Sequence, residues 1–121
     1  MGYYESGRNI DVLVGKVLKD VRVGDSEIVL VTEDDKTYKM YHEQDCCEHV
    51  WVEDVTGDVR DLIGSKIVEA SEVSNREGYG DYGDSQTWTF YKLGTRKGSV
   101  TIRWCGQSNG YYSEAVSFIE V

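Results

Sequence analysis

The chain has 121 residues and a mass of 13.7 kDa, the size of one domain, and we expect residues 1–121 to fold as a single unit with residues 1–9 flexible. Acidic residues outnumber basic ones by 22 to 13, so the net charge is −9 and the pI is near 4.6. Such a surface argues against direct binding to the phosphate backbone of DNA or RNA. The sequence also lacks the run of about 20 apolar residues that a membrane helix needs and the features of a signal peptide, so we expect a cytoplasmic protein with no membrane partner.

The first half of the chain has the pattern of successive β-strands. β-branched residues at 16–23 and 26–33, separated by a Gly-Asp pair, indicate a hairpin. Alternation with period two over 36–42 indicates a third strand, antiparallel to the second. A short strand is expected at 50–55. These strands predict an antiparallel sheet.

The second half of the chain predicts further strands and one long loop. Alternation would place Trp88 and Phe90 on the inward face of their strand, together with the apolar residues of the strand that follows. Residues 74–86 contain three Gly and two Tyr but no aliphatic residue, which predicts the longest loop of the domain, one that could close over a ligand. The expected strands lie at 67–73, 87–91, 100–104 and 111–120.

Residues 10–18 and 59–67 form a weak internal repeat. Both have apolar residues at positions i, i+3 and i+4, then Gly15 or Gly64, then an apolar residue. The pattern predicts a helical turn with a glycine C-cap, followed by a strand, in each copy. The domain is interpreted as two related half-units packed face to face, although a chance match would give the same pattern. The expected fold class is all-β or β-dominated α+β, with antiparallel sheets and one or two short helical turns.

The segment 41–51, YHEQDCCEHVW, contains both histidines and two of the three cysteines of the chain. Thiolates and imidazoles are zinc ligands, but adjacent cysteines project in different directions and a second ligand pair is missing elsewhere, so we expect no metal and no cofactor. Three sparse cysteines do not resemble a disulfide framework either. The simplest interpretation is that Cys46 and Cys47 are free thiols, buried as small packing residues.

Catalysis by this segment is a further alternative. A cysteine beside a histidine could act as a thiolate nucleophile, but six carboxylates between residues 43 and 58 disfavour the charged thiolate. Asp45 with Glu48, or Glu53 with Asp54, could serve as an acid–base pair in hydrolysis. Because a run of charges is more often a solvated face, we expect a protein that is not an enzyme, with a hydrolase as the minor alternative.

Aromatic residues are more numerous than a core of this size needs, and they favour a binding site for flat rings. Aromatic side chains stack on nucleobases with about 1–3 kcal/mol per ring. Trp51 and the tyrosines would stack, Arg103 would pair with phosphate, and the other polar groups would orient the ligand. The alternative is that the tyrosines are ordinary cross-strand partners. The candidate ligand-binding residues are His42, Gln44, Asp45, Glu48, Trp51, Arg103, Asn109, Tyr111 and Tyr112.

Two dense segments, YHEQDCCEHVWVEDVTGD at 41–58 and QTWTFYKLGTRKGSVTIRWCGQSNGYYSEAVSF at 86–118, resemble a family of small proteins of unknown function from bacteriophages and prophages. In that family a YHEQDCCE-type segment precedes a WTFYK strand and an SNGYYSE ending. The resemblance covers nearly the whole chain from about Leu13. It brings no catalytic residues to carry over, and it implies an accessory protein made in the bacterial cytoplasm, of a kind that often counters host defence.

This context implies two functions from different classes. In the first, a rigid homo-oligomer binds and sequesters a small nucleotide-derived immune signal, such as a cyclic oligonucleotide or an ADP-ribose derivative, without altering it; the tyrosines and varied polar groups favour this function. In the second, the acidic surface mimics a nucleic acid and blocks a host defence nuclease such as a CRISPR effector, which the net charge of −9 favours. We take sequestration as the main prediction.

Overall fold

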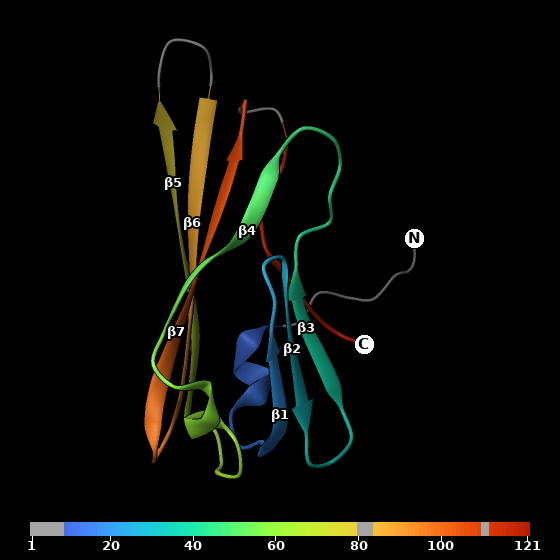
Figure 1. The fold of residues 1–121 in the computed structure, drawn as a ribbon, viewed down its shortest axis with the longest axis vertical. Helices are drawn as coiled ribbons and strands as arrows, with labels where there is room; N and C mark the ends of the chain where they lie inside the picture. Colours follow the sequence, from blue (N-terminus) through green and yellow to red (C-terminus); the bar gives the residue numbers. More distant parts are fainter. Residues whose placement is uncertain (1–8, 80–83, 110–111) are drawn as a thin grey trace.

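The computed structural model describes residues 9–79, 84–109 and 112–121, which form two antiparallel four-stranded sheets that face each other (Figure 1). The smaller sheet has the order β1 (Leu18–Val23), β2 (Glu27–Thr32), β3 (Thr37–Tyr41) and β8 (Ser117–Glu120). The larger sheet has the order β4 (His49–Thr56), β7 (Gly98–Ser108), β6 (Asp84–Thr95) and β5 (Glu69–Tyr79). The β-dominated antiparallel fold is therefore confirmed.

Helical structure in the described part of the chain is limited to two 3-10 turns, η1 (Ile10–Leu13) and η2 (Val59–Leu62). They occur where the internal repeat predicts a helical turn. No helix among the described residues is long and apolar enough to cross a membrane.

Each half of the chain repeats one order of elements: a 3-10 turn, three strands in a meander and a fourth strand. In the first half the meander is β1-β2-β3, and β4 leaves it to pair with β7 of the other sheet. In the second half the meander is β5-β6-β7, and β8 crosses back to pair with β3. The sheets are therefore joined by two reciprocal connections, which we call the first crossover (residues 42–48) and the second crossover (described at residues 109 and 112–116).

The two copies of the internal repeat contact each other directly. The amide of Gly15 donates to the carbonyl oxygen of Ile67 at 2.8 Å, and the amide of Gly64 donates to the carbonyl oxygen of Leu18 at 2.9 Å. Gly15 and Gly64 occupy equivalent positions of the repeat, as do Leu18 and Ile67, so exchanging the halves exchanges the two bonds. Both glycines have positive φ, +93° and +83°, a backbone region that favours glycine. The half-units predicted from the repeat are present in the fold.

The hydrophobic core lies between the two sheets. Ile28, Leu30 and Met40 enter it from the smaller sheet, and Ile102 and Trp104 enter it from the larger one. These side chains are almost fully buried, so the apolar phase predicted for the strand around residues 100–104 is correct. Burial of such large apolar side chains is the main favourable contribution to folding.

The predicted inward position of Trp88 and Phe90 is wrong. Strand β6 buries Tyr91 instead, and Trp88 and Phe90 lie half-buried on the outer face of the larger sheet. Strand pairing sets this phase, because Tyr91 lies opposite the core residue Ile102 whereas Phe90 lies opposite Arg103, which is charged. The TWTFY pattern has aromatic residues in both phases, so alternation alone did not identify the inward one.

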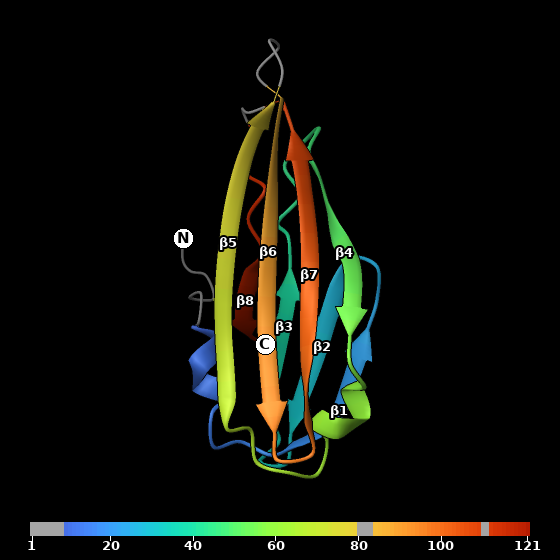
Figure 2. The same ribbon diagram turned by 90° about the vertical axis from the view of Figure 1, so that its left-hand side faces the viewer.

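Most of the predicted loop at 74–86 is strand. β5 and β6 form a hairpin that is paired from Glu69 and Gly94 to Tyr79 and Asp84, and only residues 80–83 lie outside the described part of the chain. Figure 2 shows that this hairpin and β7 extend well beyond the end of the smaller sheet. Because no second sheet packs against this extension, its strands do not need the apolar alternation by which strands are identified in a sequence.

The boundaries of the other predicted elements differ in a few places. The four strands predicted in the first half are confirmed as β1 to β4. The final strand is shorter than predicted, since β8 begins at Ser117 and residues 112–116 belong to the second crossover. Of the terminal segment predicted to be flexible, residues 1–8 lie outside the described part, whereas Asn9 caps η1 by accepting a hydrogen bond from the amide of Asp11 at 3.2 Å.

Candidate functional site

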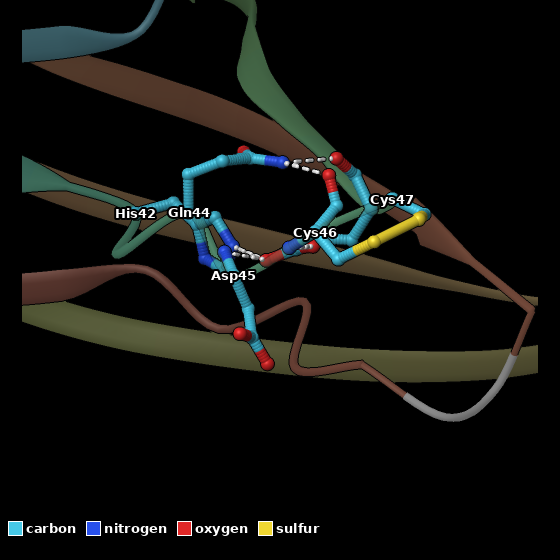
Figure 3. The surroundings of a disulfide bond; sticks show 6 residues. His42, Gln44, Asp45, Cys46 and Cys47 are labelled. Atoms are coloured by element: carbon cyan, nitrogen blue, oxygen red, sulfur yellow. Dashed lines mark hydrogen bonds and ion pairs between the residues drawn. A yellow bond between two sulfur atoms is a disulfide. The ribbon is translucent and has the colours of Figure 1, made fainter.

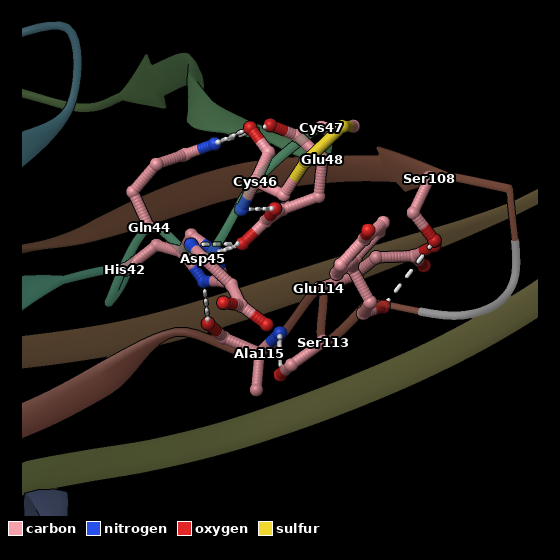
Figure 4. A network of polar contacts seen from close by, with 11 residues as sticks. His42, Gln44, Asp45, Cys46, Cys47, Glu48, Ser108, Ser113, Glu114 and Ala115 are labelled. Carbon is pink, nitrogen blue, oxygen red and sulfur yellow. Dashed lines mark hydrogen bonds and ion pairs between the residues drawn. A yellow bond between two sulfur atoms is a disulfide. The ribbon is translucent and has the colours of Figure 1, made fainter.

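The two crossovers meet at a polar centre. The Nδ1 atom of His42 in the first crossover lies 2.7 Å from the carbonyl oxygen of Ala115 in the second (Figure 4). A carboxylate lies on each side of this contact, and both are buried, since Glu48 is 4% exposed and Glu114 is 6% exposed. Each crossover thus contributes one buried carboxylate, and the contact between His42 and Ala115 connects the two crossovers.

Glu48 is held by three donors from its own crossover. Its Oε2 atom accepts from the amide of Asp45 at 2.8 Å and lies 2.6 Å from Nε2 of His42, and its Oε1 atom accepts from the amide of Cys46 at 2.9 Å. Burial acts to raise the pKa of Glu48, but the hydrogen bonds from His42 and from these backbone amides outweigh it and lower the pKa to about 2. The carboxylate is therefore ionised at neutral pH.

Both ring nitrogens of His42 have a hydrogen-bond partner. A carbonyl oxygen can only accept, so Nδ1 carries a hydrogen towards Ala115. On the other side of the ring, Nε2 lies 2.6 Å from the carboxylate of Glu48. The side chain of His42 is only 5% exposed, which shields this pair from water.

Glu114 is held by hydroxyl groups of the larger sheet. Its Oε1 atom accepts from Thr87 at 2.7 Å, and its Oε2 atom accepts from the hydroxyls of Ser85 and Ser108. Burial acts to raise the pKa of Glu114, but these hydroxyl donors outweigh it and lower the pKa below its ordinary value. The carboxylate approaches the sheet over Gly106, where a Cβ atom would lie 2.8 Å from both Cβ and the carbonyl oxygen of Glu114.

A groove opens between the second crossover and strands β5 and β6, with a volume of about 540 Å³. Arg76 provides its positive charge, and one guanidinium nitrogen lies 3.4 Å from the Ser85 hydroxyl that donates to Glu114. The groove combines this guanidinium with hydroxyl groups and one aromatic ring. Its lining residues are Ser74, Arg76, Thr87, Tyr112, Ser113, Glu114 and Ala115. We call it the crossover groove.

Cys46 and Cys47 form a disulfide between adjacent residues, and both residues are exposed (Figure 3). The prediction of free, buried thiols is therefore wrong for this pair, whereas Cys105 is free and buried. The amide group of Gln44 holds the loop around the disulfide, donating to the carbonyl oxygens of Cys46 at 3.1 Å and Glu48 at 2.7 Å. In a strand adjacent side chains point to opposite faces, but the bend at residues 46–47 brings both sulfur atoms to one side.

Five of the nine predicted site residues lie at or beside the junction of the crossovers. His42 and Glu48 form its buried pair, Asp45 donates its backbone amide to Glu48, and Gln44 holds the loop. Tyr112 lines the crossover groove. Two other predicted site residues are close to Tyr112 in the sequence. Asn109 directly follows β7, and Tyr111 lies outside the part of the chain that the structure describes.

Trp51 and Arg103 lie elsewhere, on the outer face of the larger sheet. Arg103 donates from Nε to Glu53 at 2.7 Å, and its guanidinium lies 5.4 Å from the centre of the Trp88 ring. Trp51 stacks on His49 with 4.2 Å between ring centres. The residues of β7 on either side of Arg103 face the core, so Arg103 points away from the crossover groove. Within one chain the predicted residues therefore do not share a single cavity.

Four residues of the groove region are not among the residues predicted from the sequence: Arg76, Ser85, Thr87 and Glu114. Three of them lie in or beside the stretch that was assigned to a loop. A signal was nevertheless present, because Ser85, Thr87 and Thr89 place a hydroxyl at every second position, as expected for one face of a strand. Recognising that polar face requires knowing that the hairpin continues past the smaller sheet.

The groove offers hydrogen bonding, one positive charge and one aromatic ring. Both buried carboxylates are ionised and surrounded by donors, so they act as fixed acceptors. Among the residues that the structure describes, no group of three or more His, Cys, Asp and Glu side chains could hold a metal ion. Such a lining can form hydrogen bonds and an ion pair with a small polar molecule.

The fold and the groove define a small two-sheet β protein with a polar site where its two crossovers meet. Residues 11–118 match a family described as a domain of unknown function (DUF7448), and the protein belongs to this family. Neither the curated proteins nor the solved structures contain a match to the chain.

Proposed function

We propose that the protein binds a small nucleotide-derived molecule in the crossover groove and sequesters it without catalysis. The observation that carries this proposal is the presence of Arg76, Tyr112 and several hydroxyl groups around one groove of about 540 Å³. A volume in this range suits a small-molecule ligand. The three kinds of group match the three parts of a nucleotide: phosphate, base and ribose.

Arg76 is the group that would bind phosphate. Its guanidinium has five N–H donors, and the one hydrogen bond that it makes to side chains the structure describes, with Ser85, is long at 3.4 Å. The other donors can form the paired hydrogen bonds that favour arginine at phosphate groups. The hydroxyls of Ser85, Thr87 and Ser108 already solvate the charge of Glu114, so Arg76 is not its main partner.

Tyr112 and the serine hydroxyls would bind the rest of the ligand. The ring of Tyr112 would stack on a base, a contact of about 1–3 kcal/mol. Ser74 and Ser113 present hydroxyl groups at the groove that could bond to ribose. A dissociation constant near 1 nM corresponds to about −12 kcal/mol, which would allow the protein to remove a scarce signal by mass action. In a phage-encoded protein this activity would counter a defence system that signals through nucleotides.

Ligand binding can be tested with a charge reversal in the groove. Cyclic dinucleotides and ADP-ribose would be titrated into the native protein by calorimetry, and into Arg76→Glu. The variant should weaken binding by about tenfold or more, because a phosphate would then meet a carboxylate. Arg22→Glu is the matched control, since Arg22 is exposed and paired with Asp20 on the edge strand β1. Absence of binding to all probes, or equal loss in both variants, would contradict the proposal.

Recovery of the ligand separates sequestration from hydrolysis. After incubation, the protein would be denatured by heat and the released molecule analysed by mass spectrometry. Sequestration returns the intact nucleotide, whereas an enzyme would leave products.

A second candidate function, inhibition of a host nuclease by nucleic-acid mimicry, is favoured by the net charge of −9. Such a complex would weaken steeply as salt increases, whereas a nucleotide held in the groove by stacking and hydrogen bonds would respond less.

A further inference from the structure

The Cys46–Cys47 disulfide is exposed and is linked to the crossover groove through a series of hydrogen bonds. Both cysteines are exposed, so a thiolate can reach the sulfur atoms. The loop in which they lie also supplies the donors that hold Glu48. We propose that this disulfide is a site of thiol–disulfide exchange with a dithiol reductant, and that its redox state controls the position of the second crossover. The effect on ligand binding rests on the function proposed above.

A continuous series of hydrogen bonds links the disulfide to the groove. The amide of Cys46 donates to Glu48 at 2.9 Å, and Glu48 lies 2.6 Å from Nε2 of His42. The opposite side of the His42 ring lies 2.7 Å from the carbonyl oxygen of Ala115, which is itself a lining residue of the groove. The next residue along the groove is Glu114. Every contact in the series is direct, and the central pair is buried, since the side chains of His42 and Glu48 are 5% and 0% exposed.

The disulfide restrains the residue that makes the first contact in this series. It closes a small ring that contains the peptide group between Cys46 and Cys47, so the backbone there has little freedom. The amide nitrogen of Cys46 lies just outside this ring, bonded to a Cα atom of the ring, so opening the ring restores rotation about the adjoining bonds and lets this amide move relative to Glu48. Loss of the Cys46 donor leaves the Glu48 carboxylate, and with it His42, less restrained. His42 in turn contacts the carbonyl oxygen of Ala115.

The exchange reaction is balanced by the reductant alone. A thiolate of the dithiol attacks one sulfur, the bond between the two cysteine sulfurs breaks, and a mixed disulfide forms. The second thiol of the reductant then attacks that mixed disulfide as its thiolate. The products are two cysteine thiols in the protein and the oxidised, disulfide form of the reductant. Two electrons and two protons pass from the reductant to the protein.

Accessibility of the disulfide can be measured by alkylation of the folded protein. The protein would be treated with dithiothreitol under native conditions, alkylated with iodoacetamide and analysed by peptide mass spectrometry. We expect modification of Cys46 and Cys47 after reduction, none before it, and none at the buried Cys105. The variant Cys105→Ser is the matched control and should behave as the natural chain. Resistance of the pair to reduction until the protein unfolds would overturn the proposal.

Transmission to the groove can be measured without a ligand. Amide hydrogen exchange of residues 112–116 would be compared between oxidised and reduced protein, with the double variant Cys46→Ser and Cys47→Ser as a permanently open form. Reduction should accelerate this exchange by about tenfold, with the core strands β6 and β7 unchanged. Equal exchange in the oxidised, reduced and serine forms would refute the coupling.

Binding of the cyclic dinucleotides and ADP-ribose to both redox forms separates the two proposals. If none of them binds while exchange at 112–116 responds to reduction, the proposed function fails and the redox coupling stands. If a nucleotide binds equally to both forms and exchange does not respond, the coupling fails and the proposed function stands. Weaker binding to the reduced form, together with faster exchange, supports both.

Discussion

Glu114 lies directly over Gly106, in the space that a side chain at residue 106 would occupy. A Cβ atom at Gly106 would lie 2.8 Å from the Cβ and the carbonyl oxygen of Glu114 and 3.2 Å from a methyl group of Val50. Ordinary carbon contacts are longer than this, so the crossover can approach β7 only at a glycine. The position of the crossover groove therefore depends on one residue near the end of the inner strand β7.

Gly106→Ala should destabilise the protein by about 1–3 kcal/mol, because the methyl group would displace the backbone of the second crossover. Urea denaturation followed by tryptophan fluorescence measures this change. Gly94→Ala is the control: its closest neighbour would be the end of the flexible Glu69 side chain, at 3.3 Å. Equal destabilisation by the two substitutions would contradict the packing argument.

Thr87→Val should cost about 1–3 kcal/mol, since it removes a hydrogen-bond donor from the buried, ionised Glu114 while keeping the shape of the side chain. The same denaturation assay provides the measurement. Thr101→Val is a suitable control because Thr101 lies on the outer face of β7, opposite Lys92. A loss no larger than that of the control would show that Glu114 does not depend on this hydroxyl.

The stability of the protein should fall at acidic pH in a window set by Glu48. Its pKa is lowered from 4.5 to about 2 in the folded protein, so the folded state favours the ionised form. This contribution is complete above about pH 4.5 and is lost as the pH falls towards 2, where the folded protein also takes up the proton. Asp34, whose pKa is also lowered to about 2, contributes in the same direction.

Glu48→Gln isolates the part of this dependence that belongs to the first crossover. An uncharged amide cannot titrate, so the variant should be less stable at neutral pH and should lose less stability between pH 4.5 and 2. Thermal unfolding across this range is the measurement. Asp45→Asn, which changes an exposed carboxylate to an amide in the same loop, is the control for the substitution itself. Parallel pH curves for Glu48→Gln and the natural chain would rule out the assigned role.

Arg103→Glu should leave nucleotide binding in the groove unchanged. Arg103 lies on the outer face of the larger sheet with Glu53 and Trp88, away from Arg76 and Tyr112. The substitution would still reduce stability by breaking the ion pair with Glu53. Calorimetric titration with the same nucleotides tests this prediction. Loss of binding in Arg103→Glu with retention in Arg76→Glu would place the site on the outer face.

Strands β6 and β7 show which buried side chains a local sequence pattern can identify and which it cannot. The apolar side chains around residues 100–104 lie in one phase only, and their burial followed from the sequence. Trp88, Phe90 and Tyr91 fill both phases of β6, and only the pairing with β7 identified Tyr91 as the core residue. The polar extension of β5 and β6 has no apolar alternation at all, so its strands were assigned to a loop.

Local properties were sufficient for the fold class, the first meander and the paired half-units, because alternation and turn glycines are encoded over a few neighbouring residues. The fold alone brought β4 and β8 into opposite sheets, placed His42 against Ala115 and formed a groove around Arg76. These contacts join residues far apart along the chain, and their free energy comes from burial and shared hydrogen bonds that no local pattern contains.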